Sequence, residues 1–116
     1  MELNRLRDSV YDYAKKKGYH DEKQDVLSQK LMLVVGELAE AMEAERKGKT
    51  PLKDVKLPVG TGIDFEPFKG TIEEEIADAV IRLADIAGMI GMDLDWWVNA
   101  KMNYNRDNLH KVGKLY

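Results

Sequence analysis

The 116-residue sequence predicts an all-α fold, a four-helix bundle with one long loop between the second and third helices. Two observations lead to this prediction. Apolar residues recur every three or four positions along most of the chain, as in amphipathic helices. All three prolines and four of the nine glycines fall within residues 48–70, which separate two helical segments. We therefore expect a single domain over residues 1–116, with a loop that has room for a short hairpin.

The first two helices are bounded by local signals. Residues 2–17 have helical spacing of apolar side chains and end in a lysine run before Gly18, which is typical of a helix C terminus. Asp21 followed by Gln24 resembles a capping box and predicts the start of a longer second helix. That helix is expected to continue to Gly48.

The third and fourth helices also have predicted caps. Thr71 and Glu74 form a capping box that opens a helix to about Gly91, and Asp93 can cap a helix that runs to about Asn108. The third helix is apolar around most of its circumference, more than a surface helix in a small monomer needs. This pattern predicts an oligomer, a homodimer or a homotetramer.

The composition excludes several classes of function. A net charge of −3, from 21 acidic and 18 basic residues, supplies no basic field for nucleic acid, so we expect no nucleic-acid partner. The absence of cysteine excludes disulfides and thiolate metal sites. No apolar run has the length of a membrane span or a signal peptide. We therefore expect a cytoplasmic protein without a membrane partner.

Two pairs of acids interrupt the apolar faces of the second and third helices. Glu37 and Glu40 form one pair, and Glu75 and Asp78 repeat the same i, i+3 spacing, which places each pair on one helix face. Carboxylates on an apolar face need a cation or a basic partner nearby. Four carboxylates without cysteine favour Mg²⁺, with Mn²⁺ as a substitute. The alternative is that both pairs are ordinary solvated acids that pair with lysine and arginine.

A di-iron carboxylate bundle is the main competing metal site. It requires a Glu-x-x-His motif on two helices, and the two histidines, His20 and His110, do not provide it. The sequence therefore favours magnesium over iron.

The two acidic motifs resemble a known family, the MazG-like nucleotide pyrophosphohydrolases of the all-α NTP pyrophosphatase superfamily. The family's ExxE and ExxD pairs stand here in GELAEAMEAERKG (36–48) and EEEIADAVIRLADIAG (73–88). The ending KMNYNRDNLHKVGKLY (101–116) is also similar to that of family members, so that the resemblance covers nearly the whole chain.

The resemblance implies an enzyme that hydrolyses nucleoside or deoxynucleoside triphosphates to a monophosphate and pyrophosphate. The four carboxylates would hold Mg²⁺, and Glu40 would accept a proton from the attacking water. Lys101, Tyr104 and Asn105 stand at i, i+3 and i+4 and would bind the phosphates of the nucleoside triphosphate substrate.

Some positions depart from the family pattern. Leu33 and Val34 stand where members often have a further glutamate, and loop 48–70 is longer than usual. Arg82 is expected to pair with Asp78 or Asp85. The missing glutamate motivates one alternative, a helical interaction module that binds phosphate without turnover. A second alternative, from a family related in fold, is phosphoribosyl-ATP pyrophosphohydrolase.

Four aromatic residues have two interpretations each. Trp96 and Trp97, at the start of the fourth helix, are expected to pack in a core or an interface, with stacking on a base as the alternative. Tyr19 and His20 are expected to form a hydrophobic staple, with a place near the base as the alternative.

Overall fold

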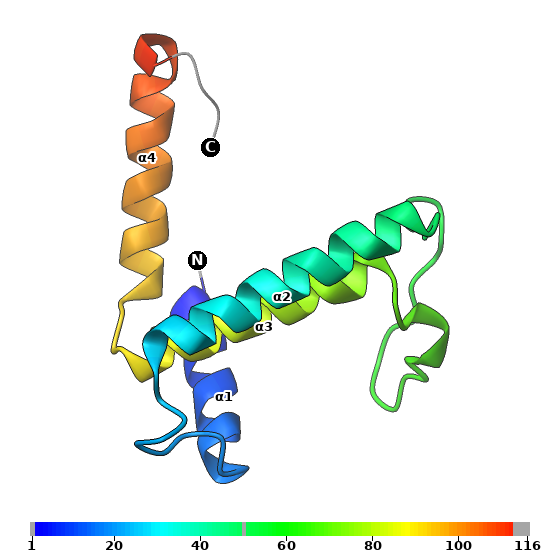
Figure 1. The fold of residues 1–116 in the computed structure, drawn as a ribbon. Helices are drawn as coiled ribbons and strands as arrows, with labels where there is room; N and C mark the ends of the chain where they lie inside the picture. Colours follow the sequence, from blue (N-terminus) through cyan, green and yellow to red (C-terminus); the bar gives the residue numbers. More distant parts are fainter. Residues whose placement is uncertain (1, 50, 113–116) are drawn as a thin grey trace. The chain divides into compact units, whose positions relative to one another are not determined.

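The computed structural model describes residues 2–49 and 51–112, and of residues 109–112 it describes the backbone alone. These residues form four α-helices and one short 3-10 helix, without a strand (Figure 1). The all-α prediction is therefore confirmed. The helices are α1 (Leu3–Lys16), α2 (Leu27–Arg46), α3 (Ile72–Met89) and α4 (Leu94–Val112), with the 3-10 helix η1 at Glu66–Phe68.

The chain divides into two compact units. Residues 26–83 form one, here called the central unit, and residues 1–25 with 84–116 form the other, the terminal unit. Among the described residues, no helix is both long and apolar enough to cross a membrane.

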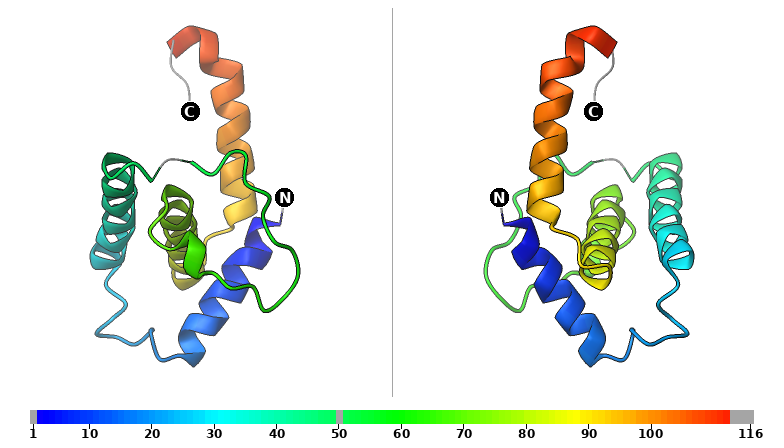
Figure 2. Two further views of the ribbon diagram at one scale, coloured as in Figure 1. Left: turned by 90° about the vertical axis from the view of Figure 1, so that its right-hand side faces the viewer. Right: turned by 90° about the vertical axis from the view of Figure 1, so that its left-hand side faces the viewer.

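In the central unit, α2 and the first turns of α3 lie side by side and antiparallel (Figures 1 and 2). Three of their side chains are buried, those of Val34, Ala44 and Ala79. Many larger apolar side chains of both helices remain exposed in this chain. They are Leu27, Leu31, Met32, Leu33, Val35, Leu38 and Met42 on α2, and Ile76, Val80, Ile81 and Leu83 on α3.

The second helix begins at Leu27, later than the predicted start at Asp21. The Asp21 carboxylate does accept hydrogen bonds from the backbone N–H of Lys23 (2.9 Å) and of Gln24 (2.8 Å), as a cap would. These bonds close only a single turn, because the backbone at Val26 is extended (φ −99°, ψ 108°). The predicted start of the second helix at Asp21 is therefore wrong, because an extended residue separates the capped turn from the helix.

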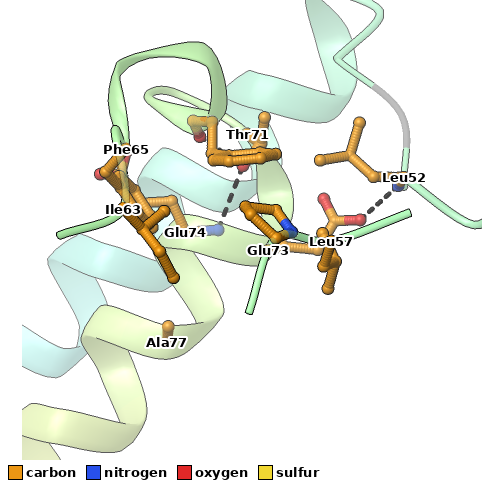
Figure 3. A pocket seen from close by; sticks show the side chains of 10 residues that line it. Leu52, Leu57, Ile63, Phe65, Thr71, Glu73, Glu74 and Ala77 are labelled. Atoms are coloured by element: carbon orange, nitrogen blue, oxygen red, sulfur yellow. Dashed lines mark hydrogen bonds between the residues drawn. The ribbon is translucent and has the colours of Figure 1, made fainter. Parts of the chain in front are cut away.

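The long loop packs against the start of α3 and contains no hairpin among its described residues. The Glu73 carboxylate accepts a hydrogen bond from the backbone N–H of Leu52, and the Thr71 hydroxyl accepts one from Glu74 N–H at 3.2 Å (Figure 3). Thr71 is therefore confirmed as the cap, whereas the Glu74 carboxylate accepts its hydrogen bond from Gly70 N–H (2.7 Å) and does not complete the predicted capping box. Loop and helix enclose a cavity of about 300 Å³. Its apolar lining includes Leu52, Leu57, Pro58, Ile63, Phe65, Phe68 and Ala77.

In the terminal unit, α1 helps to cap α4. The Asn4 side-chain oxygen accepts hydrogen bonds from the backbone N–H of Leu94 (2.8 Å) and of Asp95 (3.2 Å). The Asp93 carboxylate accepts one from Trp96 N–H at 3.1 Å, as predicted for an N-cap. The predicted start of the fourth helix is therefore confirmed, whereas its end lies at Val112, beyond the predicted Asn108.

The contact between α1 and the end of α3 depends on Gly88. A Cβ atom on Gly88 would lie 2.5 Å from Tyr11 Cβ, an atom fixed by the backbone of α1. Gly36, in the middle of α2, has no atom within 4 Å of such a Cβ.

We expect Gly88→Ala to destabilise the protein by about 1 to 3 kcal/mol, because the helices must move apart to admit the methyl group. Gly36→Ala is the matched control and should stabilise it by up to about 1 kcal/mol, since alanine favours the helix. Urea unfolding of both variants measures these changes. Equal stabilities for the two variants would contradict the close approach.

Candidate metal centre

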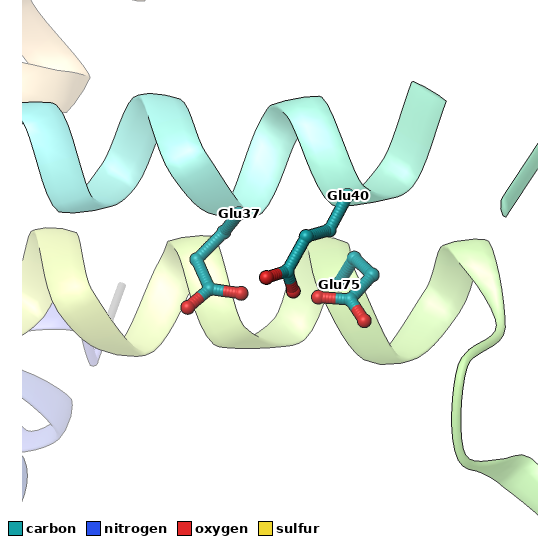
Figure 4. A group of neighbouring side chains, drawn as sticks. All are labelled: Glu37, Glu40 and Glu75. Carbon is teal, nitrogen blue, oxygen red and sulfur yellow. The ribbon is translucent and has the colours of Figure 1, made fainter. Parts of the chain in front are cut away.

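Three carboxylates meet between the two helices of the central unit. Glu37 and Glu40 come from α2 and Glu75 from α3, and one oxygen of each lies within 4.8 Å of the others (Figure 4). The antiparallel arrangement brings the pairs together because each helix turn returns positions i and i+3 to the same face. The structure thus joins three of the four carboxylates that the sequence predicts as metal ligands.

The three acids differ in their access to solvent. Glu75 is 8% exposed, and its Oε2 atom is buried without a hydrogen-bond partner. Glu37 is half-buried, and Glu40 is exposed. Buried polar atoms nearly always have a partner, and an orphaned one commonly marks a site for an ion or water. The group is therefore buried at Glu75 and open to solvent at Glu40.

The electrostatics of the group show an excess of negative charge around Glu75. Burial, followed by hydrogen bonding and charge repulsion from Glu40 and Glu37, raises the pKa of Glu75 from 4.5 to about 7. Burial also raises the pKa of Asp78, and the charge of Glu37 adds to this effect. A cation between the carboxylates would reverse both effects.

Arg82 supplies the one guanidinium that contacts this group among the described residues. Its Nε donates a hydrogen bond of 2.8 Å to Glu37 Oε1, and this bond lowers the pKa of Glu37. The prediction that Arg82 pairs with Asp78 or Asp85 is wrong. On the antiparallel partner helix Glu37 lies within reach, whereas Asp85 is bound to His20.

The donor set suits a hard divalent cation. Carboxylate oxygens are the preferred ligands of Mg²⁺, which retains water and so leaves positions for a substrate. Asp78, the fourth predicted ligand, is half-buried one turn beyond Glu75 and lies outside the group of three. Its participation stays a prediction.

Comparisons with protein-family models, with curated proteins and with solved structures found no match to this chain.

The predicted phosphate-binding residues lie on α4, in the terminal unit. Lys101 and Asn105 line the same apolar cavity, together with Trp97. The Lys101 amine stands 4.6 Å from the centre of the Tyr104 ring, a cation–π contact. The predicted helical spacing of the three residues is confirmed, and their role in substrate binding stays a prediction.

Sequence reasoning missed the environment of His20. Its side chain is 4% exposed, with Nδ1 2.6 Å from Asp25 Oδ1 and Nε2 2.7 Å from Asp85 Oδ1. The edge of its ring also contacts Tyr11, at 4.8 Å between ring centres. The predicted staple of Tyr19 and His20 is wrong, because Tyr19 is 57% exposed and His20 is held by two carboxylates.

Trp96 and Trp97 contact one another edge to face at 4.9 Å. They are 58% and 56% exposed, so that packing in the core of this chain is excluded and packing in an interface stays a prediction.

Without metal, we expect the protein to lose stability as the pH rises. Glu75 binds its proton more tightly in the folded state, so this contribution is full below pH 4.5, the ordinary pKa, and is lost as the pH rises through about 7. The pKa of Glu37 is lowered, chiefly by its hydrogen bond to Arg82, so the stability that Glu37 contributes is lost as the pH falls.

The contribution of Glu75 is isolated by measuring the melting temperatures of the wild type and of Glu75→Gln in chelator at several pH values. Between about pH 5 and about pH 8 the wild type should lose more stability than the variant. Saturating Mg²⁺ should stabilise the wild type more at the higher pH, because the metal needs the ionised carboxylates. Parallel curves for the two proteins would contradict the assigned pKa.

Proposed function

We propose that this protein is a Mg²⁺-dependent hydrolase that converts nucleoside triphosphates to monophosphates and pyrophosphate, in a MazG-like fold. The observation that carries the proposal is the group of Glu37, Glu40 and Glu75, with its buried, unpartnered oxygen. Acids on a solvated helix face would be fully exposed and would not leave such an atom.

The three carboxylates differ in their exposure to solvent, and this difference indicates a separate role for each. When bound, Mg²⁺ neutralises phosphate charge and activates water for attack. Glu75 and Glu37, which are buried and half-buried, would hold the metal, and Arg82 positions the Glu37 side chain. Glu40 is exposed and would be open to both the metal and an incoming water molecule.

In the proposed reaction, a water oxygen forms a bond to the α-phosphorus and Glu40 accepts the proton. The bond from the α-phosphorus to the bridging oxygen breaks, and that oxygen leaves as part of pyrophosphate. A carboxylate held within hydrogen-bond reach of the attacking water is a suitable general base for this transfer.

Pyrophosphate release from a panel of canonical and modified nucleoside triphosphates tests the proposal directly. We expect release in Mg²⁺ or Mn²⁺ and none in chelator. The panel includes phosphoribosyl-ATP, because selective hydrolysis of this compound would indicate a phosphoribosyl-ATP pyrophosphohydrolase instead. Binding of nucleotide without any release would instead indicate the non-catalytic module.

We further propose that the protein acts as a homo-oligomer. The central unit leaves apolar side chains of both helices exposed, and it contains no fully buried large side chain among its described residues. An antiparallel helix pair of this kind becomes stable when a second pair covers it, as in a four-helix bundle. A second copy of this chain provides such a pair by symmetry.

We expect the wild type to have the mass of a dimer or tetramer in light scattering. Leu38, which is 48% exposed on α2, should lie in the interface, so Leu38→Lys should shift the mass toward the monomer and lower the melting temperature. Gln29→Lys adds the same charge to an exposed polar position of α2 and should preserve the mass. A monomeric wild type would overturn the proposed assembly.

A further inference from the structure

A second cavity adjoins the carboxylate group in the central unit. It measures about 210 Å³ and shares Glu40 and Glu75 with the group. Two lysines, Lys47 and Lys49, also line it. The cavity therefore combines the acids of the candidate metal centre with two cations from the end of α2.

The end of α2 positions these lysines. Gly48 has a left-handed backbone (φ 77°), Gly48 N–H donates to Glu45 O at 3.0 Å, and Lys49 N–H donates to Ala44 O at 2.9 Å. This pair of hydrogen bonds is the Schellman motif, which reverses the chain at the helix end. As a result Lys49 turns back toward α3 instead of continuing away from it.

Lys49 reaches the first residues of α3. Its Nζ lies 2.9 Å from the position that a Cβ of Gly70 would occupy. Glycine at this position therefore leaves room for the amine. The positive end of the α3 dipole lies at the same place and also favours an anion.

The other lysine near the start of α3 is already neutralised. The Lys69 amine lies 2.8 Å from the Glu74 carboxylate, which is buried. The exposed Glu43 also lines the cavity, and it pairs more closely with Arg46 (3.2 Å) than with Lys47 (4.0 Å). Lys49 forms no ion pair among the described residues. Lys47 and Lys49 are thus the cations that remain available to a ligand in this cavity.

We propose that Lys47 and Lys49 bind the β- and γ-phosphates of the substrate, and hence the pyrophosphate product, in the cavity beside Glu40 and Glu75. This inference rests on the proposed function, and it sets the orientation of the triphosphate in the site. The α-phosphate lies at the carboxylate end, where water attacks, and the leaving group lies at the lysine end. Three carboxylates alone would repel a polyphosphate, so that cations beside them are required in addition to the metal.

The proposal differs from the sequence-based assignment of phosphate contacts to α4. Both lysines belong to the same unit as the acids, and their backbone is fixed by the helix end.

Calorimetric titration with inorganic pyrophosphate and Mg²⁺ tests the inference without turnover. We expect the double variant Lys47→Met, Lys49→Met to bind pyrophosphate about tenfold more weakly or worse, since contacts to charged groups are strong. Lys53→Met removes an exposed lysine of the same loop that does not line the cavity, and should bind as the wild type does. Circular dichroism confirms that each variant is folded.

The outcomes separate this inference from the proposed function. Pyrophosphate binding that the double variant retains in full overturns the lysine site, even if the wild type hydrolyses triphosphates. No binding of pyrophosphate by the wild type also overturns it. A third outcome is that the wild type hydrolyses no triphosphate but binds pyrophosphate, and that the double variant does not bind it. In that case the proposed function fails and the lysine site stands. In an active wild type, the double variant should also show a raised KM and weaker inhibition by pyrophosphate.

Discussion

Glu75→Gln is expected to lower pyrophosphate release by more than about 100-fold. Above about pH 7, where Glu75 is ionised, it should also raise the melting temperature of the metal-free protein. Loss of a residue that merely supports a metal ligand typically costs 10- to 100-fold, so loss of a ligand itself should cost at least the upper value. The amide keeps the size of the side chain but cannot carry the charge that the metal requires.

The gain in stability has a separate cause. Glu75 is buried beside two further carboxylates, and its Oε2 has no partner in the folded chain. A glutamine side chain removes the repulsion and supplies a donor to Glu37 or Glu40. Residues that serve catalysis often reduce stability in this way, whereas residues that serve only the fold do not.

Glu45→Gln is the matched control, since Glu45 is an exposed acid of α2 outside the group. It should change neither activity nor melting temperature. Activity assays and thermal scans of the three proteins, in chelator and in Mg²⁺, give the result. A Glu75→Gln protein that is as active as the wild type would remove Glu75 from the proposed site, and one that is less stable would assign it a structural role.

The parts of the fold that could be predicted depend on short-range signals. The cap at Thr71 and the glycine after α3 lie next to the helix that they delimit, and both predictions agree with the structure. The i, i+3 spacing of the acids is likewise local, so the pairing of Glu40 with Glu75 needed only the further assumption that the two helices are antiparallel neighbours.

The parts that could not be predicted depend on contacts between distant positions. Arg82 binds Glu37, 45 residues away, in preference to the nearer acids of its own helix. Spacing along one helix shows which side chains share a face, but the register between two helices decides which acid an arginine reaches. The position of Lys49 has a similar origin, because it depends on where the reversed chain meets α3.

His20→Ala should destabilise the protein by about 2 to 4 kcal/mol, the largest effect expected from a residue outside the acidic group. Its buried ring lies between Asp25 and Asp85 and contacts Tyr11, and truncation of such a side chain to alanine removes both packing and hydrogen-bond partners, which typically costs about 3 to 5 kcal/mol. The expected value is lower because Asp25 is 30% exposed and solvent can replace part of the contact.

The measurement is urea unfolding at a pH near neutrality, with Tyr19→Ala as the control. Tyr19 is the neighbouring residue and is 57% exposed, so its truncation should cost less than about 0.5 kcal/mol. If His20→Ala has the same free energy of unfolding as the wild type, the contacts of His20 with the two carboxylates do not stabilise the fold.

A double-mutant cycle with Asp85→Asn separates the ionic contact from the packing of the ring. In the wild type, Asp85→Asn weakens the hydrogen bond to His20 Nε2 and should be destabilising. In the His20→Ala background the same change removes a carboxylate that has lost its partner, and should be neutral or stabilising. If Asp85→Asn instead has the same cost in both backgrounds, the ring stabilises the fold through its packing against Tyr11 and not through its carboxylates.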